Sequence, residues 1–350
     1  MWGKKIAAEV GRPWLDPGLD AVVADVEPAL RPYEQVDPDR LDAASAVVAP
    51  AVDRLVEAVA GLRGEPDRQV ALVRALSDLL APAADHLLRR AEGVGPDHAA
   101  DEADLRAMAA QGLLAVAWQI RSGALARDVA AHRWVPFHDV VARADAQCVR
   151  ALELTPGHPL AATTRLTAAL GSGDLDSAGW QARFEAATAT APTLFAAHDS
   201  MLYALTPKWY GSVEAMFGFA RRVAREAPEG EPVAAMLPLA HVYHWEAGVL
   251  GGESPAKGLA VLKDGLPELL AARGRWLAGR SPAEAGRAHV AGLDANHLFG
   301  WAFHIVDKDL AREHFSVGLG RVARMPWGLF GDPAAAYGDV MKRLKVKTAS

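Results

Sequence analysis

The sequence predicts an all-α protein, and three observations favour that class. Alanine, more than valine, isoleucine or tyrosine, supplies the 51% of residues that are hydrophobic, and alanine has the highest helix propensity because helix formation costs its side chain no entropy. Apolar residues recur at steps of three and four along most of the chain, which is typical of amphipathic helices. From about residue 135, helix-ending prolines return at a constant spacing, and this predicts stacked helix pairs.

The first 36 residues are expected to be an irregular lead segment, whose four prolines leave room for one short helix near residues 19–29. Residues 37–125 are expected to form an N-terminal helical cap. The first of its helices is predicted to begin at Asp37. A second is predicted to cover 66–80, with a break at Pro82 and a continuation to Ala91. A linker at 93–104 is then expected to lead to a helix at 105–120. The run LLAVAW in the last helix is apolar on most sides, which predicts burial between neighbouring helices.

Residues 126–330 carry the predicted repeat, and residues 331–350 form a tail with a short helix. The prolines Pro156, Pro192 and Pro228 stand 36 residues apart. Each is followed by a predicted helix and then by a glycine-containing turn, and the helices cover 159–170, 194–205 and 232–243. A helix pair of this length cannot bury its apolar face alone, so neighbouring pairs are expected to stack.

The residues around these prolines resemble the tetratricopeptide-repeat-like superfamily in a degenerate form. A small or slim side chain stands five positions before each proline, at Ala151, Ala187 and Val223, and the aromatic Phe184 lies one turn before Ala187. The resemblance covers roughly residues 135–330 and extends to uncharacterised bacterial repeat proteins. It implies an α-α superhelix of stacked helix pairs with an N-terminal helical cap, and it implies little about activity.

Charge and composition restrict the partners and the compartment. The formal net charge is −6 with no clustered basic face, so no nucleic-acid partner is expected. The apolar run at the N-terminus is interrupted by Glu9 and Arg12, and no uncharged stretch reaches the length that spans a bilayer. The single cysteine, Cys148, can form neither an intramolecular disulfide nor a thiolate zinc site. These features predict a cytoplasmic protein with no membrane partner.

The turn at residues 207–212 is the most distinctive local motif, because it combines a cation, two large aromatic residues and a glycine. In stacked helix pairs such turns line one rim, where aromatic side chains anchor peptides. The preferred function is therefore a protein–protein interaction scaffold with a protein or peptide partner. Its concave groove is predicted to include Lys208, Trp209, Tyr210, His198, Tyr203 and His241. In the simpler interpretation, Trp209 packs between helices, Gly211 adopts a positive φ, and Ser212 caps the next helix.

Histidines suggest an alternative function, a small-molecule-binding protein or enzyme with a pocket in the C-terminal half. That pocket would be lined by His241, His244, Trp245, His297, Trp301 and His304. An imidazole there is suited to acid or base chemistry, although large residues at helical spacing also simply fill a core. His241 and His244 share a helix face as metal ligands do, but the HExxH glutamate is missing.

No metal, cofactor or catalytic residue is therefore assigned, and the interpretation favours a protein without enzymatic activity. The sequence lacks the GxGxxG, GxxxxGK[ST] and GxSxG motifs that mark dinucleotide, phosphate-loop and hydrolase sites. A third hypothesis is a structural helical domain that associates with itself as a homo-oligomer.

Overall fold

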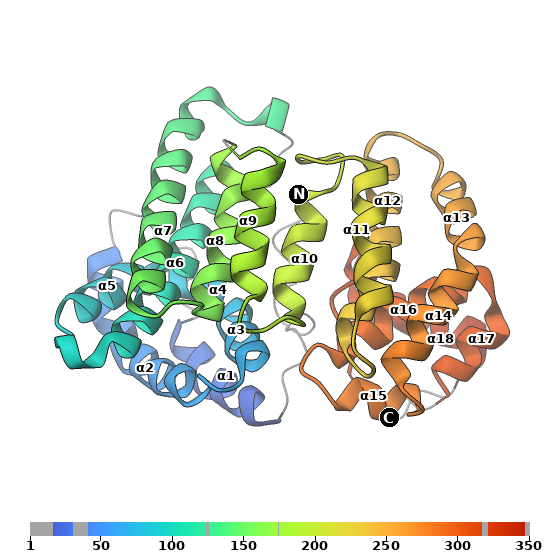
Figure 1. Cartoon of the computed structure of the whole chain (residues 1–350), viewed down its shortest axis with the longest axis horizontal. Helices are drawn as coiled ribbons and strands as arrows, with labels where there is room; N and C mark the ends of the chain where they lie inside the picture. The colour runs from blue at the N-terminus through green and yellow to red at the C-terminus, as the bar shows by residue number, and fades with distance from the viewer. Residues whose placement is uncertain (1–16, 31–40, 123–125, 174, 317–320, 347–350) are drawn as a thin grey trace. The chain divides into compact units, whose positions relative to one another are not determined.

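The structure is a computed structural model that describes residues 17–30, 41–122, 126–173, 175–316 and 321–346. These residues form helices and no strands, which confirms the predicted all-α class (Figure 1). Contacts divide the chain into two compact units. The N-terminal unit ends at Ser200, and the described part of the C-terminal unit begins at Met201.

The N-terminal unit contains a succession of α-helices joined by short loops and 3₁₀ turns. They are α1 (Pro17–Leu30), α2 (Leu41–Gly61), α3 (Pro66–Ala75), α4 (Ser77–Leu80), α5 (Ala84–Glu92), α6 (Ala99–Arg121), α7 (Trp134–Leu154), α8 (Pro159–Ser172), α9 (Ser177–Thr188) and α10 (Phe195–Ala204), which contains the boundary. Helices α7, α8 and α9 lie side by side (Figure 1), and each contacts the next.

Helix α6 lies at the centre of this unit and contacts α2, α4, α5, α7 and α8. Its apolar residues share a core with α7 and α8, in which small side chains such as Ala110, Ala144 and Ala168 let the helices approach closely. Gly112 permits a close approach of α6 to the end of α4, since a Cβ there would lie 2.6 Å from the carbonyl oxygen of Leu80. The predicted boundary between residues 125 and 126 therefore falls inside one compact unit.

One predicted linker was wrong over half its length. Residues 93–104 were expected to be a loop, but α6 begins at Ala99 after a short 3₁₀ turn, η4 (Pro96–His98). The alanines at the start of α6 favour helix, and Asp101 and Glu102 stabilise its positive N-terminal end. The charge of this segment therefore belongs to a helix start.

The helix-ending role of the prolines is confirmed. Helix α7 ends two residues before Pro156, and α9 ends four residues before Pro192. Helix α11 (Val213–Glu226) ends two residues before Pro228. The ring of a proline disfavours the α conformation for the residue before it, which favours a helix end upstream of each of these prolines.

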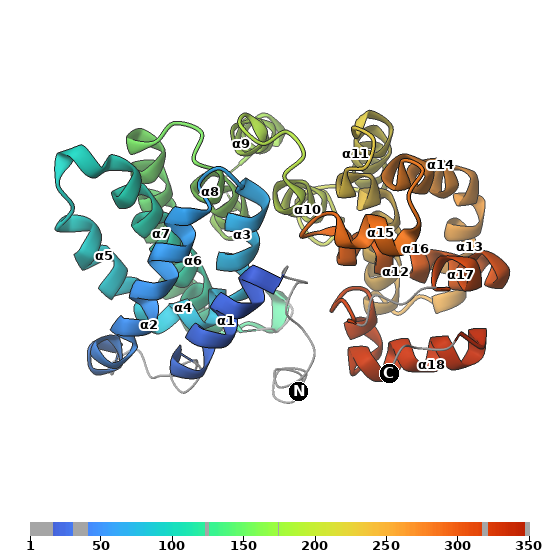
Figure 2. The ribbon, with the colours of Figure 1, turned by 90° about the horizontal axis from the view of Figure 1, so that it is seen from below.

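The C-terminal unit continues after α11. It contains the 3₁₀ turn η7 (Pro232–Ala235), α12 (Met236–Leu250), α13 (Pro255–Asp264), α14 (Leu266–Leu277), α15 (Pro282–Arg287), α16 (Gly292–Val306), α17 (Lys308–His314), the 3₁₀ turn η8 (Trp327–Phe330) and α18 (Pro333–Leu344). Helix α16 is buried along most of its length and contacts α12, α13, α14, α15 and α17 (Figure 2).

Helices far apart in the sequence therefore meet in the C-terminal unit. A superhelical stack joins each helix pair mainly to the next pair, whereas α16 contacts α12 and α13 as well as its sequence neighbours. The superhelical arrangement accordingly stays a prediction.

Candidate functional site

A surface pocket of about 260 Å³ opens in the N-terminal unit. The first turns of α6 form one of its walls, and α2, α5 and the loops after them supply the rest. The lining combines apolar and charged side chains of Val56, Arg63, Arg90, Val94, Gly95, His98, Asp101, Asp104 and Leu105. This pocket lies outside the segments to which the sequence assigns a groove or a histidine site.

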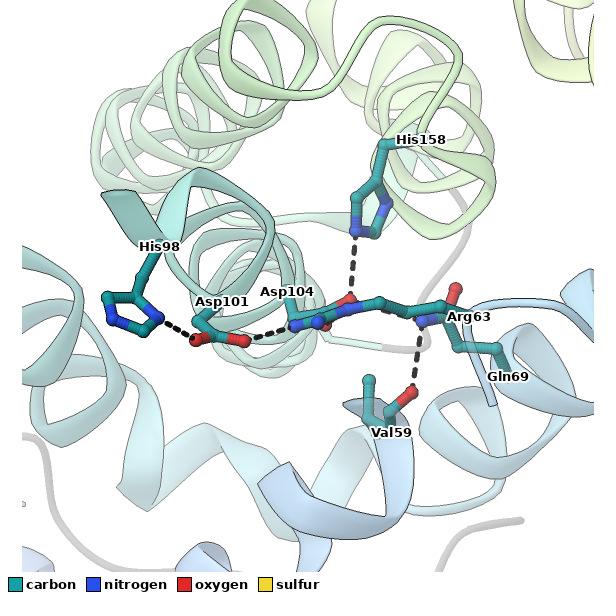
Figure 3. Close-up of polar contacts among 7 residues, drawn as sticks. All are labelled: Val59, Arg63, Gln69, His98, Asp101, Asp104 and His158. Carbon is teal, nitrogen blue, oxygen red and sulfur yellow. Dashed lines mark hydrogen bonds and ion pairs between the residues drawn. The ribbon is translucent and has the colours of Figure 1, made fainter. Parts of the chain in front are cut away.

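A buried carboxylate lies at the inner side of this pocket (Figure 3). Asp104 is 1% exposed, and its Oδ2 accepts a hydrogen bond from Nε of Arg63 at 2.7 Å. Its Oδ1 lies 3.1 Å from Nε2 of Gln69 and 3.0 Å from Nε2 of His158. Gln69 also donates to the carbonyl oxygen of Val59 at 3.2 Å. One carboxylate therefore ties together α6, α3, the end of α2 and the start of α8.

The hydrogen bonds of His158 define its tautomer. Its Nδ1 accepts the backbone N–H of Ala161 at 3.2 Å, so that His158 serves as the N-cap of α8 ahead of Pro159. Nε2 must then carry the ring hydrogen, and its N–H donates a hydrogen bond to Asp104. An Asp–His pair acts as a catalytic base only when the second ring nitrogen is free for the substrate or nucleophile. Here both nitrogens are engaged, so the pair is structural.

A second set of charged side chains at this pocket lies nearer to solvent than Asp104. Nη2 of Arg63 contacts Oδ1 of Asp101 at 2.5 Å, and Nδ1 of His98 lies 3.2 Å from Oδ2 of the same carboxylate. The hydrogen bond from Arg63 lowers the pKa of Asp101. Arg90, on the last turn of α5, forms an ion pair with Asp53 of α2. Charges of both signs thus surround the pocket.

Four of the predicted groove residues come together in the C-terminal unit. Tyr203 lies on α10, and Lys208, Trp209 and Tyr210 lie on the turn that follows it. The ring of Tyr203 lies 5.9 Å from that of Trp209 and 5.2 Å from that of Tyr243 on α12, and Trp209 lies 6.2 Å from Tyr210. Nζ of Lys208 donates to the hydroxyl of Tyr203 at 3.1 Å. We call Tyr203, Lys208, Trp209, Tyr210 and Tyr243 the aromatic surface.

The two histidines predicted for the same groove lie elsewhere. His198 belongs to the N-terminal unit, where it packs edge-on against Phe184 at 5.0 Å and its Nδ1 bonds to the carbonyl oxygen of Leu194. His241 is 3% exposed and packs against Phe217 at 4.8 Å. Burial lowers the pKa of His241 to about 3. Neither imidazole is part of the aromatic surface.

The turn that carries the aromatic surface agrees with the simpler interpretation in one respect and differs in another. The side chain of Ser212 caps α11, because its Oγ accepts the backbone N–H of Ala215 at 3.1 Å. Gly211 does not adopt the expected positive φ. Glycine is needed there for space, since a Cβ would lie 2.0 Å from the carbonyl oxygen of Leu205.

The residues predicted for the alternative pocket divide between two helices that contact each other, α12 and α16. On α12, His241 and His244 both face Phe217, and Trp245 lies 5.0 Å from Phe330. On α16, Trp301 is buried, and His297 and His304 pack against Trp327 at 6.0 and 5.8 Å. The histidines of α12 and those of α16 therefore contact different aromatic neighbours.

The environment of His297 and His304 is that of a packed core. Nδ1 of His297 accepts from Nε1 of Trp327 at 2.8 Å, and Nε2 bonds to the carbonyl oxygen of Arg321 at 3.1 Å. Burial lowers the pKa of His297 and of His304 to about 4. Both nitrogens of His297 are engaged, so this ring has no atom available for acid or base chemistry.

Within the described ranges, no three histidine, cysteine, aspartate or glutamate side chains are arranged to hold a metal ion. None of the helices in those ranges combines the length and the apolar character needed to cross a membrane. Comparisons with protein-family models, curated proteins and solved structures give no match to this chain. The tetratricopeptide-like resemblance therefore stays a prediction.

The sequence interpretation missed Arg63, Asp104 and His158. One signal for Asp104 is available, because it shares a helical face with Met108 and Ala115, which are buried. A lone acid on an apolar face implies a buried partner. That signal was lost when the segment up to residue 104 was assigned to a linker.

Proposed function

We propose that this protein is an interaction scaffold that binds a segment of another protein at the aromatic surface of its C-terminal unit. One observation carries the proposal: neighbouring aromatic rings form a cluster that is partly open to solvent, with Tyr210 42% exposed and the other rings half-buried. Tyrosine and tryptophan dominate the binding energy of protein interfaces, because they offer a large contact area with few rotatable bonds.

The aromatic surface is held in place before a partner arrives. The backbone N–H groups of Trp209 and Gly211 donate to the carbonyl oxygen of Thr206 at 3.0 and 3.3 Å, and that of Tyr210 donates to Ala204 at 3.1 Å. These bonds fix the turn that bears the rings. A rigid surface loses little conformational entropy on binding, which supports a role in recognition.

The neighbouring chemistry favours a particular kind of partner segment. Leu250, which is 57% exposed, lies two turns beyond Tyr243 on the same face of α12, and it extends the apolar contact area. Lys208 is exposed and adds a positive charge beside the rings. A peptide with an apolar anchor next to an acidic residue complements both features.

In this proposal the helix pairs of residues 135–330 serve as the frame, in the tetratricopeptide-like manner that the proline spacing predicts. The aromatic surface is then the contact region presented by that frame. The buried histidines of α12 and α16 support the frame through packing.

Selection of peptides from a random library against the purified full-length chain tests the proposal. Selected peptides are expected to bind the Tyr210→Ala variant at least about tenfold more weakly, since interface tyrosines are hot spots. The Val135→Ala variant is the matched control, because Val135 is an apolar residue of the other unit that is 68% exposed. Equal affinity of the selected peptides for the wild type and Tyr210→Ala would contradict the proposal.

A further inference from the structure

We propose that α13 is an acid-sensitive cover of α12 in the C-terminal unit. When the imidazole of His241 takes up a proton, α13 detaches from α12, and water reaches His241 and the ring of Trp245. Three features support this device: a buried imidazole without hydrogen bonds, a close backbone contact over that imidazole, and a helix held by few buried side chains. The device goes beyond the scaffold function and does not depend on it.

His241 is buried on α12 without a hydrogen-bond partner. It is 3% exposed, and within the described residues neither of its ring nitrogens has a partner. His297 and His314 are buried as deeply, but both nitrogens of each are engaged. A proton on His241 would create a buried cation whose two N–H groups lack acceptors, which is costly. Protonation therefore requires that water reach this ring.

The ionisable groups around His241 oppose its protonation. Arg221 of α11 lies 5.4 Å from the ring of Phe217, and His241 and His244 pack against the same ring at 4.8 and 5.7 Å. Among the described residues of α13, α14, α16 and η7, which also contact α12, no carboxylate offsets these groups at His241. Burial, and then His244 and Arg221, lower the pKa of His241 to about 3. The closed unit therefore keeps the ring neutral.

The backbone at the junction of α13 and α14 lies directly over the imidazole. A Cβ on Gly265, the residue between these helices, would lie 2.9 Å from Nε2 of His241. Glycine is needed at this position because any side chain would meet the ring. Water reaches Nε2 from this side only when the junction moves away from α12.

Helix α13 lies at the edge of the unit (Figure 1) and is held by few buried side chains. Among its described side chains only Leu262 is buried, and the others are half-buried or exposed. Gly258 lies against α12, since a Cβ there would be 3.2 Å from Cδ1 of Trp245. By contrast, α14 contains Trp276, which is 0% exposed. Elements with few buried contacts open at low cost, so α13 is the helix expected to detach.

Detachment of α13 is then linked to pH through His241. In the open state the imidazole is in water and titrates near 6.5, whereas in the closed state its pKa is about 3. Below pH 6.5 the open state takes up a proton that the closed state does not, so acid shifts the equilibrium towards opening. Between pH 7.5 and 5.5 the equilibrium constant for opening is expected to rise about tenfold.

Hydrogen–deuterium exchange of the full chain at pH 7.5 and 5.5 tests this inference. A detached α13 is expected to melt, because an isolated helix of 10 residues is marginal in water, and its amides then exchange. After correction for the intrinsic effect of pH, the protection of α13 is expected to fall about tenfold. At pH 7.5 it is already expected to be lower than that of α16. Equal protection of α13 and α16 at both pH values would overturn the inference.

Three variants assign the effect to His241. His241→Leu is expected to remove the tenfold fall in α13 protection, because leucine takes up no proton. Gly265→Ala is expected to lower the protection of α13 at pH 7.5 at least about threefold and to keep the pH dependence, since its methyl group pushes against the ring. His304→Leu is the matched control, because it removes a buried histidine of α16 and is expected to leave the fall in α13 in place.

The control separates local detachment from unfolding of the whole unit. If α13 exchanged only when the unit unfolds, His241→Leu and His304→Leu would both reduce the pH dependence of its protection. That result would overturn the inference, and so would a fall in α13 protection that is as large in His241→Leu as in the wild type.

Discussion

At the residue scale, two buried histidines of the C-terminal unit differ in their hydrogen bonds. Within the described residues neither ring nitrogen of His241 has a partner, whereas both nitrogens of His297 do. His241→Leu removes an unsatisfied polar group, so the free energy of unfolding at pH 7.5 is expected to rise by about 1–2 kcal/mol. Urea denaturation followed by circular dichroism measures this change.

His297→Leu is the paired variant with the opposite expected sign. It leaves the Nε1–H of Trp327 and the carbonyl oxygen of Arg321 without their partner, so the free energy of unfolding is expected to fall by about 2–3 kcal/mol. Equal losses in the two histidine variants would show that hydrogen bonding does not distinguish these sites.

The buried carboxylate of the N-terminal unit is the most sensitive single side chain that we identify. Asp104→Ala leaves Arg63, Gln69 and His158 without their shared acceptor, and a loss of about 3–5 kcal/mol is expected. Asp101→Ala is the control, because Asp101 is 45% exposed and an exposed ion pair contributes less than about 1 kcal/mol. Guanidinium denaturation of both variants gives the comparison, which fails if Asp101→Ala is the more damaging change.

At the element scale, the space around a helical glycine determines how its replacement by alanine changes stability. A Cβ at Gly300 of α16 would lie 1.9 Å from Cζ of the buried Phe315, so Gly300→Ala is expected to destabilise the fold by about 2–3 kcal/mol. Gly218, on α11, is exposed and has nothing within 4 Å of a built Cβ. Gly218→Ala is expected to stabilise the fold by about 0.5–1 kcal/mol. Thermal unfolding of the two variants should therefore shift in opposite directions.

Helix positions were largely predictable from sequence, because helix ends are local. Pro156 and Pro228 identify the ends of α7 and α11 through the conformation of the preceding residue. The start of α6 was missed because the charged residues of its first turn look like a loop when the partner of Asp104 is unknown.

Helix packing was less predictable than helix position. A sequence period reports which elements resemble one another, and it does not report that α16 contacts α12 and α13. The candidate sites show the same limit. The aromatic turn at 207–212 is contiguous in sequence, so it is predictable. The contacts of Asp104 with Arg63 and His158 join residues 41 and 54 positions apart, so the sequence does not predict them.

At the scale of the whole molecule, buried histidines predict sensitivity to acid. Burial lowers the pKa of His241 and His314 to about 3, and of His297 and His304 to about 4. In the unfolded chain each histidine titrates near 6.5. Above pH 6.5 both states are neutral at these positions. Below it the unfolded state binds protons that the folded state does not, so stability falls from about pH 6.5 toward pH 4.

The size of this effect is measurable. At pH 5 each of these histidines is expected to lower the free energy of unfolding by about 2 kcal/mol relative to pH 7.5. Urea titrations at intervals between pH 7.5 and 5 measure the slope before most carboxylates protonate. A free energy of unfolding that stays constant over this range would show that the rings are not held neutral by burial.

The whole molecule is expected to bind its partners at the aromatic surface. Hydrogen–deuterium exchange on the full chain, with and without a library-selected peptide, tests it most directly. We expect the peptide to slow exchange in segments 203–213 and 243–250, which contain the aromatic surface and the exposed end of α12. Slowed exchange only at other segments, with these two unchanged, would contradict the claim.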